Sequence, residues 1–274
     1  MIVALLARQS LLEQRGGDTE QILQTALALE NLGHSVHIIG PSDPIPPSTE
    51  VLHFFNIGRP ADALAHFAQF QGRKVVSTLF VDYSRADRER WPALFALLGT
   101  HRLEFLKTMA RGLNGTDHRP PLRYFLRGQK RSMRWILNQA HAIITSSQSE
   151  LQRLQPVCKA LGGKTLRDKH RLIPLGVNEP FLVQPSSYAG TRQGLLLVGR
   201  LEHIKGQLPF IHLASKMGWP LTVVGDASAN QGDYAQRCRE AAGPTVQFVG
   251  VQEVPQLISL MDRHAAVVIP SQVA

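Results

Sequence analysis

Residues 195–206 read LLLVGRLEHIKG, a short apolar stretch followed directly by a glycine and an arginine and then, five residues after the arginine, by a lysine. Leu195 to Val198 predict a buried strand, and the apolar spacing from Lys205 to Met217 predicts a helix after the turn. Parallel α/β sheets bind ligands at the carboxyl ends of their strands. Either cation alone would be an ordinary surface charge, but Arg200 and Lys205 together predict a site for one anion.

The beginning of the chain follows the same plan. Met1 to Ala7 predict a buried strand, and a loop from Arg8 to Gly17 leads to a helix from Asp18 to Leu32. Asp18 and Gln21 resemble a capping box at the start of this helix. The amides of Gly16 and Gly17 can approach an anion closely, helped by the helix dipole, because glycine has no Cβ; alternatively, the two glycines only permit a tight turn.

Alternating strands and helices extend over the rest of the chain. They predict an α/β fold with two doubly wound parallel sheets, of which the second stops partway through its pattern. The domains we expect are residues 1–180, a linker at 181–191 and residues 192–274. The expected strands are 35–40, 51–56, 74–81, 142–146, 171–174, 195–198, 221–224, 246–249 and 265–269, and the expected helices are 60–70, 88–140 as one long insertion, 205–217, 234–242 and 254–263.

The composition is that of a globular protein and excludes several classes. Hydrophobic residues make up 43% of the 274 positions and charged residues 19%. The two cysteines, Cys158 and Cys238, predict neither a disulfide framework nor a zinc site. The longest apolar run, Met1 to Ala7, is far below the ~20 residues of a membrane span, which predicts a cytoplasmic location. The formal net charge of +9 predicts an acidic partner.

Motifs for other chemistries are missing. The sequence has no Gly-x-Gly-x-x-Gly after its first strand, no Gly-x-Ser-x-Gly, no His-Glu-x-x-His and no Asp-x-Asp, which argues against a dehydrogenase, a hydrolase and a zinc protease. Gly163-Lys164-Thr165 resembles the end of a phosphate-binding loop, but Cys158 stands where the first glycine of that motif belongs. The scattered histidines predict no metal cluster.

Seven stretches, in order, resemble the landmarks of family-four retaining glycosyltransferases of the GT-B fold. They are GGDTEQILQTALALENLGHSVHIIG, HAIITSSQSELQRL, LIPLGVNEPF, LLLVGRLEHIKG, LTVVGD, VQFVGVQEVPQLISLM and AAVVIPS. The resemblance implies two Rossmann-like domains facing each other across a cleft, with the nucleotide-sugar held mainly by the second. It implies transfer of a sugar, with retention of configuration, to an acceptor glycan or glycolipid in cell-surface polysaccharide, glycolipid or lipopolysaccharide synthesis.

The same resemblance implies roles for six residues. Arg200 and Lys205 would clamp the donor diphosphate, and Gly16 and Gly17 would close over the donor phosphate or the acceptor. The last two, Gly250 and Val251, would lie beside the base. Neither a metal nor a cofactor is expected, because the two cations and helix dipoles would neutralise the leaving diphosphate.

Two departures from the family pattern affect the expected activity. Leu79 and Phe80 stand where family members carry a histidine, which leaves Asp82 as the nearest candidate for a catalytic residue. The sequence ends at Ala274, on or before the first of two glutamates that bind the ribose in the family. We therefore expect a C-terminally truncated second domain and no sugar transfer by these 274 residues. The alternative is a non-catalytic GT-B remnant or partner protein that retains only a phosphate site.

Most of the positive charge lies between residues 101 and 134. This segment has nine basic residues and two acidic ones, so it contributes +7 of the net +9, and apolar residues are interleaved with them. The pattern predicts peripheral binding to an anionic membrane, a property that the resemblance also implies. The alternative is a solvated helical face with its apolar side in the core. No nucleic-acid recognition motif is present, so no nucleic-acid partner is expected. The basic residues are Arg102, Lys107, Arg111, Arg119, Arg123, Arg127, Lys130, Arg131 and Arg134.

Overall fold

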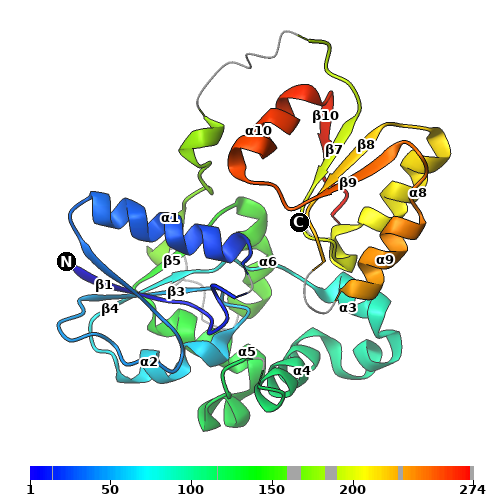
Figure 1. Ribbon diagram of the computed structural model, residues 1–274. Helices are drawn as coiled ribbons and strands as arrows, with labels where there is room; N and C mark the ends of the chain where they lie inside the picture. The colour runs from blue at the N-terminus through cyan, green and yellow to red at the C-terminus, as the bar shows by residue number, and fades with distance from the viewer. Residues whose placement is uncertain (14, 116, 159–167, 183–189, 228–230, 272–274) are drawn as a thin grey trace. The chain divides into compact units, whose positions relative to one another are not determined.

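The computed structural model describes all residues except 14, 116, 159–167, 183–189, 228–230 and 272–274. The chain divides into two compact units, Met1–Gly176 and Val177–Ala274, and each has its own parallel sheet (Figure 1). Gly163-Lys164-Thr165, the motif similar to a phosphate-binding loop, lies outside the described residues, as does most of the predicted linker.

In the described part of the first unit, six parallel strands pair in the order β2-β1-β3-β4-β5-β6. The chain order reverses at β1, which lies between β2 and β3. In a doubly wound sheet, such a reversal leaves a ligand-binding crevice at the carboxyl ends of the strands. The strands are β1 (Ile2–Leu6), β2 (Ser35–Ile39), β3 (Val51–Phe55), β4 (Arg73–Ser77), β5 (Ala142–Thr145) and β6 (His170–Leu172).

Helices cover both faces of this sheet, with α1 on one side and α2 on the other (Figure 1). Leu5 and Phe55 pack against Ile22 of α1, whereas Phe54 and Val76 belong to the larger core cluster formed with α2, α5 and α6. Apolar side chains on both faces explain why these strands are nearly continuous apolar runs. The helices are α1 (Gly17–Asn31), η1 (Pro60–Asp62), α2 (Leu64–Gln69), α3 (Ser84–Arg90), α4 (Pro92–Leu113), α5 (Leu122–Gln139) and α6 (Gln148–Cys158), where η marks a 3₁₀ helix.

The predicted long helical insertion consists of α3, α4 and α5. Gly99 interrupts α4 with φ 66° and ψ 178°, and Gly128 interrupts α5 with φ 69° and ψ 178°. Both conformations are open almost only to glycine. Hydrophobic spacing alone does not reveal such breaks, because the apolar pattern continues on each side of the glycine.

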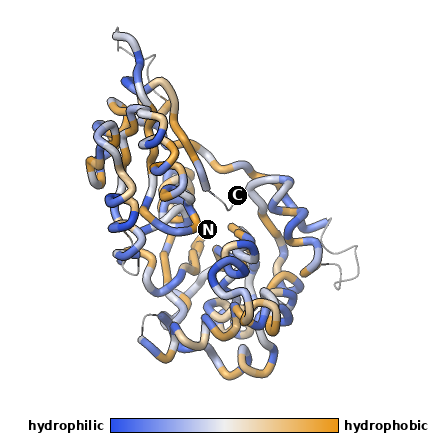
Figure 2. The backbone as a smooth tube through the Cα atoms, turned by 90° about the vertical axis from the view of Figure 1, so that its right-hand side faces the viewer, coloured by the Kyte–Doolittle hydropathy of each residue, from blue (hydrophilic) through white to orange (hydrophobic). Residues whose placement is uncertain are grey.

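In the described part of the second unit, four parallel strands pair in the order β10-β7-β8-β9. Ile211 of α8 and Cys238 of α9 pack against Val223 in its core. The elements are η3 (Glu179–Phe181), β7 (Leu195–Val198), η4 (His203–Lys205), α8 (Gln207–Met217), β8 (Leu221–Val224), α9 (Gly232–Glu240), β9 (Val246–Gly250), α10 (Val254–Arg263) and β10 (Ala266–Val268). Figure 2 shows hydrophobic strands in both units and helices that alternate between hydrophilic and hydrophobic residues.

The predicted α/β fold class is confirmed, and three local predictions are corrected. The capping residue of α1 is Gly16, so its box partner is Thr19 and not the predicted pair Asp18 and Gln21. The strand predicted for 74–81 ends at Ser77, and the helix predicted from Lys205 begins at Gln207. No described helix combines the length and the apolar character needed to cross a bilayer.

Candidate functional site

At the carboxyl edge of the second sheet, the residue that follows one strand donates a hydrogen bond to the last residue of the neighbouring strand. The amide of Gly199, after β7, donates to the Val224 carbonyl at 2.9 Å, and the amide of Gly225, after β8, donates to the Gly250 carbonyl at 2.7 Å. The three glycines have φ of 148°, 122° and 69°. Positive φ at each strand end lets the chain turn sharply there.

Gly225 is fixed by a close backbone approach. A Cβ on this residue would lie 2.2 Å from the carbonyl oxygen of Gly199 and 3.4 Å from the amide nitrogen of Arg200. Only glycine therefore permits the β7 and β8 loops to pack together here. Gly225 was not predicted as a site residue, although a glycine follows each of β7 and β8 and ends β9.

Arg200 projects from the first of these loops. Its guanidinium donates to Glu202 Oε1 at 3.1 Å, and 46% of its side chain is exposed against 13% for Glu202. Gln207, a buried residue at the start of α8, fixes this loop. Its Nε2 donates a hydrogen bond to the Arg200 carbonyl at 2.6 Å. Arg200 is thus an accessible cation with an internal carboxylate partner.

Lys205 lies at the end of η4, two residues before α8, and not at the start of the helix itself. Its amide donates to the Glu202 carbonyl at 2.9 Å, which fixes the turn between the two cations. Its side chain is half-buried and has no ion-pair partner among the described residues. Gly206, with φ 66°, then allows the chain to enter α8.

Both cations lie at the point where the strand order of the second sheet reverses. β7 pairs with β8 on one side and with β10 on the other, so the loop after β7 is at the topological switch point, where α/β sheets bind ligands. The hydroxyl of Ser271, after β10, donates to the Ile204 carbonyl at 3.5 Å and brings the neighbouring loop to η4. Gly250 and Val251 follow β9 at the same edge, and Val251 is exposed.

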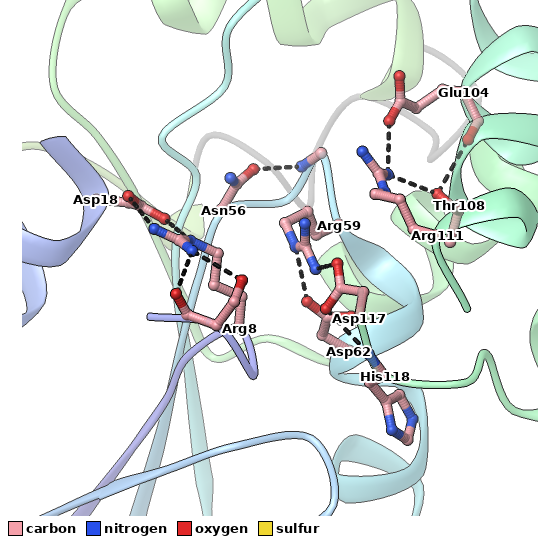
Figure 3. Close-up of polar contacts among 12 residues, drawn as sticks. Arg8, Asp18, Asn56, Arg59, Asp62, Glu104, Thr108, Arg111, Asp117 and His118 are labelled. Atoms are coloured by element: carbon pink, nitrogen blue, oxygen red, sulfur yellow. Dashed lines mark hydrogen bonds and ion pairs between the residues drawn. The ribbon is translucent and has the colours of Figure 1, made fainter. Parts of the chain in front are cut away.

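In the first unit, Gly16 and Gly17 form the start of α1, at the carboxyl end of β1. Arg8, directly after β1, donates to Asp18 Oδ2 at 2.6 Å and to the Ser10 carbonyl at 2.7 Å (Figure 3). A half-buried cation therefore lies beside the helix start, already paired with a carboxylate. Arg8 was not predicted as a site residue, although its position at a strand end was an available signal.

A second ion cluster follows β3. Arg59 Nε donates to Asp62 Oδ2 at 2.8 Å, and its NH2 group pairs with Asp117, from the connection between α4 and α5 (Figure 3). Burial raises the pKa of Asp62, and the Arg59 charge opposes that rise. The pairs tie the helical insertion to the switch point of the first sheet. Asn56, at φ 73°, holds its loop by accepting the Gly58 amide at 3.1 Å.

Glu150 is a buried carboxylate between the loops that follow β4 and β5. It accepts hydrogen bonds from the Thr78 hydroxyl (2.5 Å), the Phe80 amide (2.7 Å), and the Ser146 amide (2.6 Å) and hydroxyl (2.7 Å). Burial raises its pKa, but these hydrogen bonds outweigh burial, so the net pKa is lowered. The Phe80 bond turns the chain away after Ser77 and explains why β4 is shorter than predicted.

Asp82 is exposed on the loop between β4 and α3. Its Oδ1 accepts the Ser84 amide at 2.9 Å, so the carboxylate has a local role at the start of α3. The Asp82 charge also acts on His101. Burial, and then the charges of Lys130 and Arg134, lower the pKa of His101, whereas the charge of Asp82 raises it. The catalytic role of Asp82 stays a prediction. The structure divides the predicted residues, with Gly16, Gly17 and Asp82 in the first unit and the others in the second.

No protein-family model and no curated protein matches the chain, but solved structures do. Sucrose-phosphate synthase from Thermosynechococcus elongatus matches with 17% identity and a TM-score of 0.65, over 99% of this chain and 75% of the other. Anabaena HepE in complex with UDP matches with 15% identity and a TM-score of 0.57, over 99% of this chain and 74% of the other. A glycosyltransferase from Rickettsia africae matches with 12% identity and a TM-score of 0.56, over 98% of this chain and 73% of the other. These neighbours have the GT-B fold, and the chain shares it.

Proposed function

We propose that the chain is a retaining glycosyltransferase of family four, which moves a sugar from a nucleotide-sugar to an acceptor hydroxyl. The observation that carries this proposal is the pair of cations, Arg200 and Lys205, at the switch point of the second sheet. The likeness to HepE, whose solved structure contains UDP, supports a nucleotide donor.

Different loops of the second unit would bind different parts of the nucleotide-sugar donor. Arg200 and Lys205 hold the diphosphate, and Gly250 and Val251 lie beside the base. As the bond between the anomeric carbon and the diphosphate oxygen breaks, negative charge grows on the leaving diphosphate. Two cations in place beforehand stabilise that charge without a metal ion or a cofactor.

The first unit supplies the acceptor side in this proposal. Gly16 and Gly17 begin α1, where the helix dipole favours an anionic group of the donor or the acceptor. The Gly16 amide donates to the Thr19 hydroxyl at 3.0 Å, so the Gly17 amide is the donor proposed to face that anion. Asp82 is the proposed polar group nearest the reacting centre. The acceptor is a glycan or glycolipid of the kind used in cell-surface polysaccharide or lipopolysaccharide synthesis.

Incubation with radiolabelled nucleotide-sugars and membrane-lipid acceptors tests the proposal. We expect a chain extended through both family glutamates to transfer the label to the lipid, and NMR of the product to show the anomeric configuration of the donor. Inversion would contradict the retaining mechanism. Binding of the nucleotide without transfer by a chain extended through both family glutamates would instead support the non-catalytic remnant.

A further inference from the structure

Helix α8 begins after a residue that has no side chain to cap it. Its N-cap residue is Gly206, with φ 66°, so the cap offers no side-chain oxygen to the amides of the first helical turn. The amide of Leu208, the second residue of α8, donates instead to the hydroxyl of Tyr234 at 2.9 Å. A side chain of α9 therefore supplies the acceptor that the N-cap residue lacks.

Tyr234 reaches this amide from the first turn of α9, which lies beside α8 (Figure 1). It is 7% exposed and belongs to the core of the second unit. Its ring also meets the ring of His203, the first residue of η4, with centres 5.8 Å apart and planes inclined at 60°. Tyr234 therefore contacts one residue that precedes Lys205 and one that follows it.

His203 is also held through its backbone. Its amide donates to Oε1 of Gln231, the N-cap residue of α9, at 3.3 Å. Its carbonyl accepts the Gly206 amide at 3.2 Å and so closes a turn that contains Lys205. We call residues 203–206 the Lys205 turn. The start of α9 thus holds this turn on both sides of the lysine.

The two cations of the candidate site have different supports. The carbonyl of Arg200 accepts a hydrogen bond from Gln207 of α8, whereas the bonds to α9 come from His203 and Leu208, on either side of Lys205. A lysine side chain is flexible, so a fixed backbone reduces the freedom that is lost when its ammonium group binds an anion. The contacts of α9 therefore bear on Lys205 more directly than on Arg200.

We propose that Tyr234 is a positioning residue that acts through Lys205: by holding the Lys205 turn, it keeps the lysine ammonium group where the diphosphate binds. The inference rests on the proposed function, which takes Lys205 as a ligand of the diphosphate. Tyr234 is buried and makes no contact with the donor in this proposal. Its hydroxyl is the essential group, because it accepts the Leu208 amide.

A double-mutant cycle, measured by calorimetric titration of UDP, tests the proposal. Tyr234→Phe removes the hydroxyl but keeps the ring against His203, and we expect it to bind UDP on the order of fivefold more weakly. Lys205→Ala removes the group through which Tyr234 acts. In that background, Tyr234→Phe should change the UDP affinity by less than about twofold. A residue that only stabilised the fold would weaken binding equally in both backgrounds.

Hydrogen exchange in the free protein gives a second measurement, which needs no ligand. We expect the Leu208 amide to exchange faster in Tyr234→Phe, on the order of tenfold, because it has lost its acceptor. Tyr124→Phe is the matched control, since it removes another buried tyrosine hydroxyl, which donates to Gln129 Oε1 at 2.6 Å in the first unit. It should leave both the Leu208 exchange and the UDP affinity unchanged. Circular dichroism checks that each variant folds.

A variant at the other contact makes the test independent of Tyr234. Gln231→Leu removes the acceptor of the His203 amide and should also weaken UDP binding, but not in the Lys205→Ala background. Gln236→Leu, an exposed change on the same helix that removes a bond to Glu240, should bind UDP like the unchanged protein.

Three results would overturn the proposal: equal losses of UDP affinity with and without Lys205, an equal loss in Tyr124→Phe, or unchanged Leu208 exchange in Tyr234→Phe. Failure of the unchanged protein to bind UDP would instead contradict the proposed function. The exchange of the Leu208 amide would still show whether Tyr234 fixes the Lys205 turn.

Discussion

Glu150 joins two loops at the carboxyl edge of the first sheet, and four hydrogen bonds converge on its carboxylate. Glu150→Gln replaces an acceptor oxygen by an amide group that donates, so it faces other donors in a site that is 2% exposed. We expect the free energy of unfolding at pH 7 to fall by about 2–4 kcal/mol, measured by urea denaturation. Glu89→Gln, which breaks an exposed pair with Arg85, should change it by no more than about 0.5 kcal/mol.

The same substitution has a predicted pH dependence. Because folding lowers the pKa of Glu150, its contribution to stability is present above the ordinary glutamate pKa of about 4.3 and is lost as the pH falls through the folded-state pKa. The difference between the unchanged protein and Glu150→Gln should therefore shrink in acid. A difference that stays constant down to pH 3 would show that the carboxylate charge is not the stabilising feature.

In the proposed donor site, Glu202 would compete with the diphosphate for Arg200. Its carboxylate already occupies the guanidinium at 3.1 Å and would repel an incoming diphosphate. Glu202→Gln should therefore tighten pyrophosphate and UDP binding on the order of fivefold in calorimetric titrations. Glu240→Gln, an exposed change on α9, should leave the affinity unchanged. Weaker binding by Glu202→Gln would mean that Glu202 orients Arg200 for the ligand.

At the scale of elements, the contact between the β7 and β8 loops depends on Gly225. Gly225→Ala places a Cβ 2.2 Å from a backbone oxygen at φ 122°, so we expect a loss of at least about 2 kcal/mol in urea denaturation. Gly232→Ala, in open space at the start of α9, should be neutral or slightly stabilising. Equal effects of the two substitutions would contradict the close approach.

Elements were predictable from sequence where a local pattern determines them. The apolar runs of the buried strands predicted β1, β7 and β8 to within two residues. The ends of helices and strands were less predictable, because they depend on partners that are distant in the sequence. Glu150, 70 residues beyond Phe80, accepts the Phe80 amide and so directs the chain away from β4. The capping box of α1 uses Thr19 and not the predicted pair, because the helix starts at Gly17. The spacing of apolar residues does not reveal this starting point.

At the scale of the molecule, strand and helix alternation predicted the α/β fold with parallel sheets. The candidate site was predictable only in part. Arg200 and Lys205 follow the end of β7 by two and seven residues, so the sequence spacing alone places both at the same strand end. Arg8 with Asp18 and Arg59 with Asp117 are pairs that the fold creates, and the 58-residue separation of the second has no periodic signal.

The central claim is that the switch point of the second sheet binds a nucleotide diphosphate. Calorimetric titration of UDP into the unchanged protein, Lys205→Ala and Lys216→Ala tests it most directly. We expect the unchanged protein and Lys216→Ala to bind alike, and Lys205→Ala to bind at least about tenfold more weakly, because it loses a hydrogen bond to a charged group. Thermal unfolding of all three should agree within a few degrees. Equal affinity of Lys205→Ala and the unchanged protein, or no UDP binding by the unchanged protein, would contradict the claim.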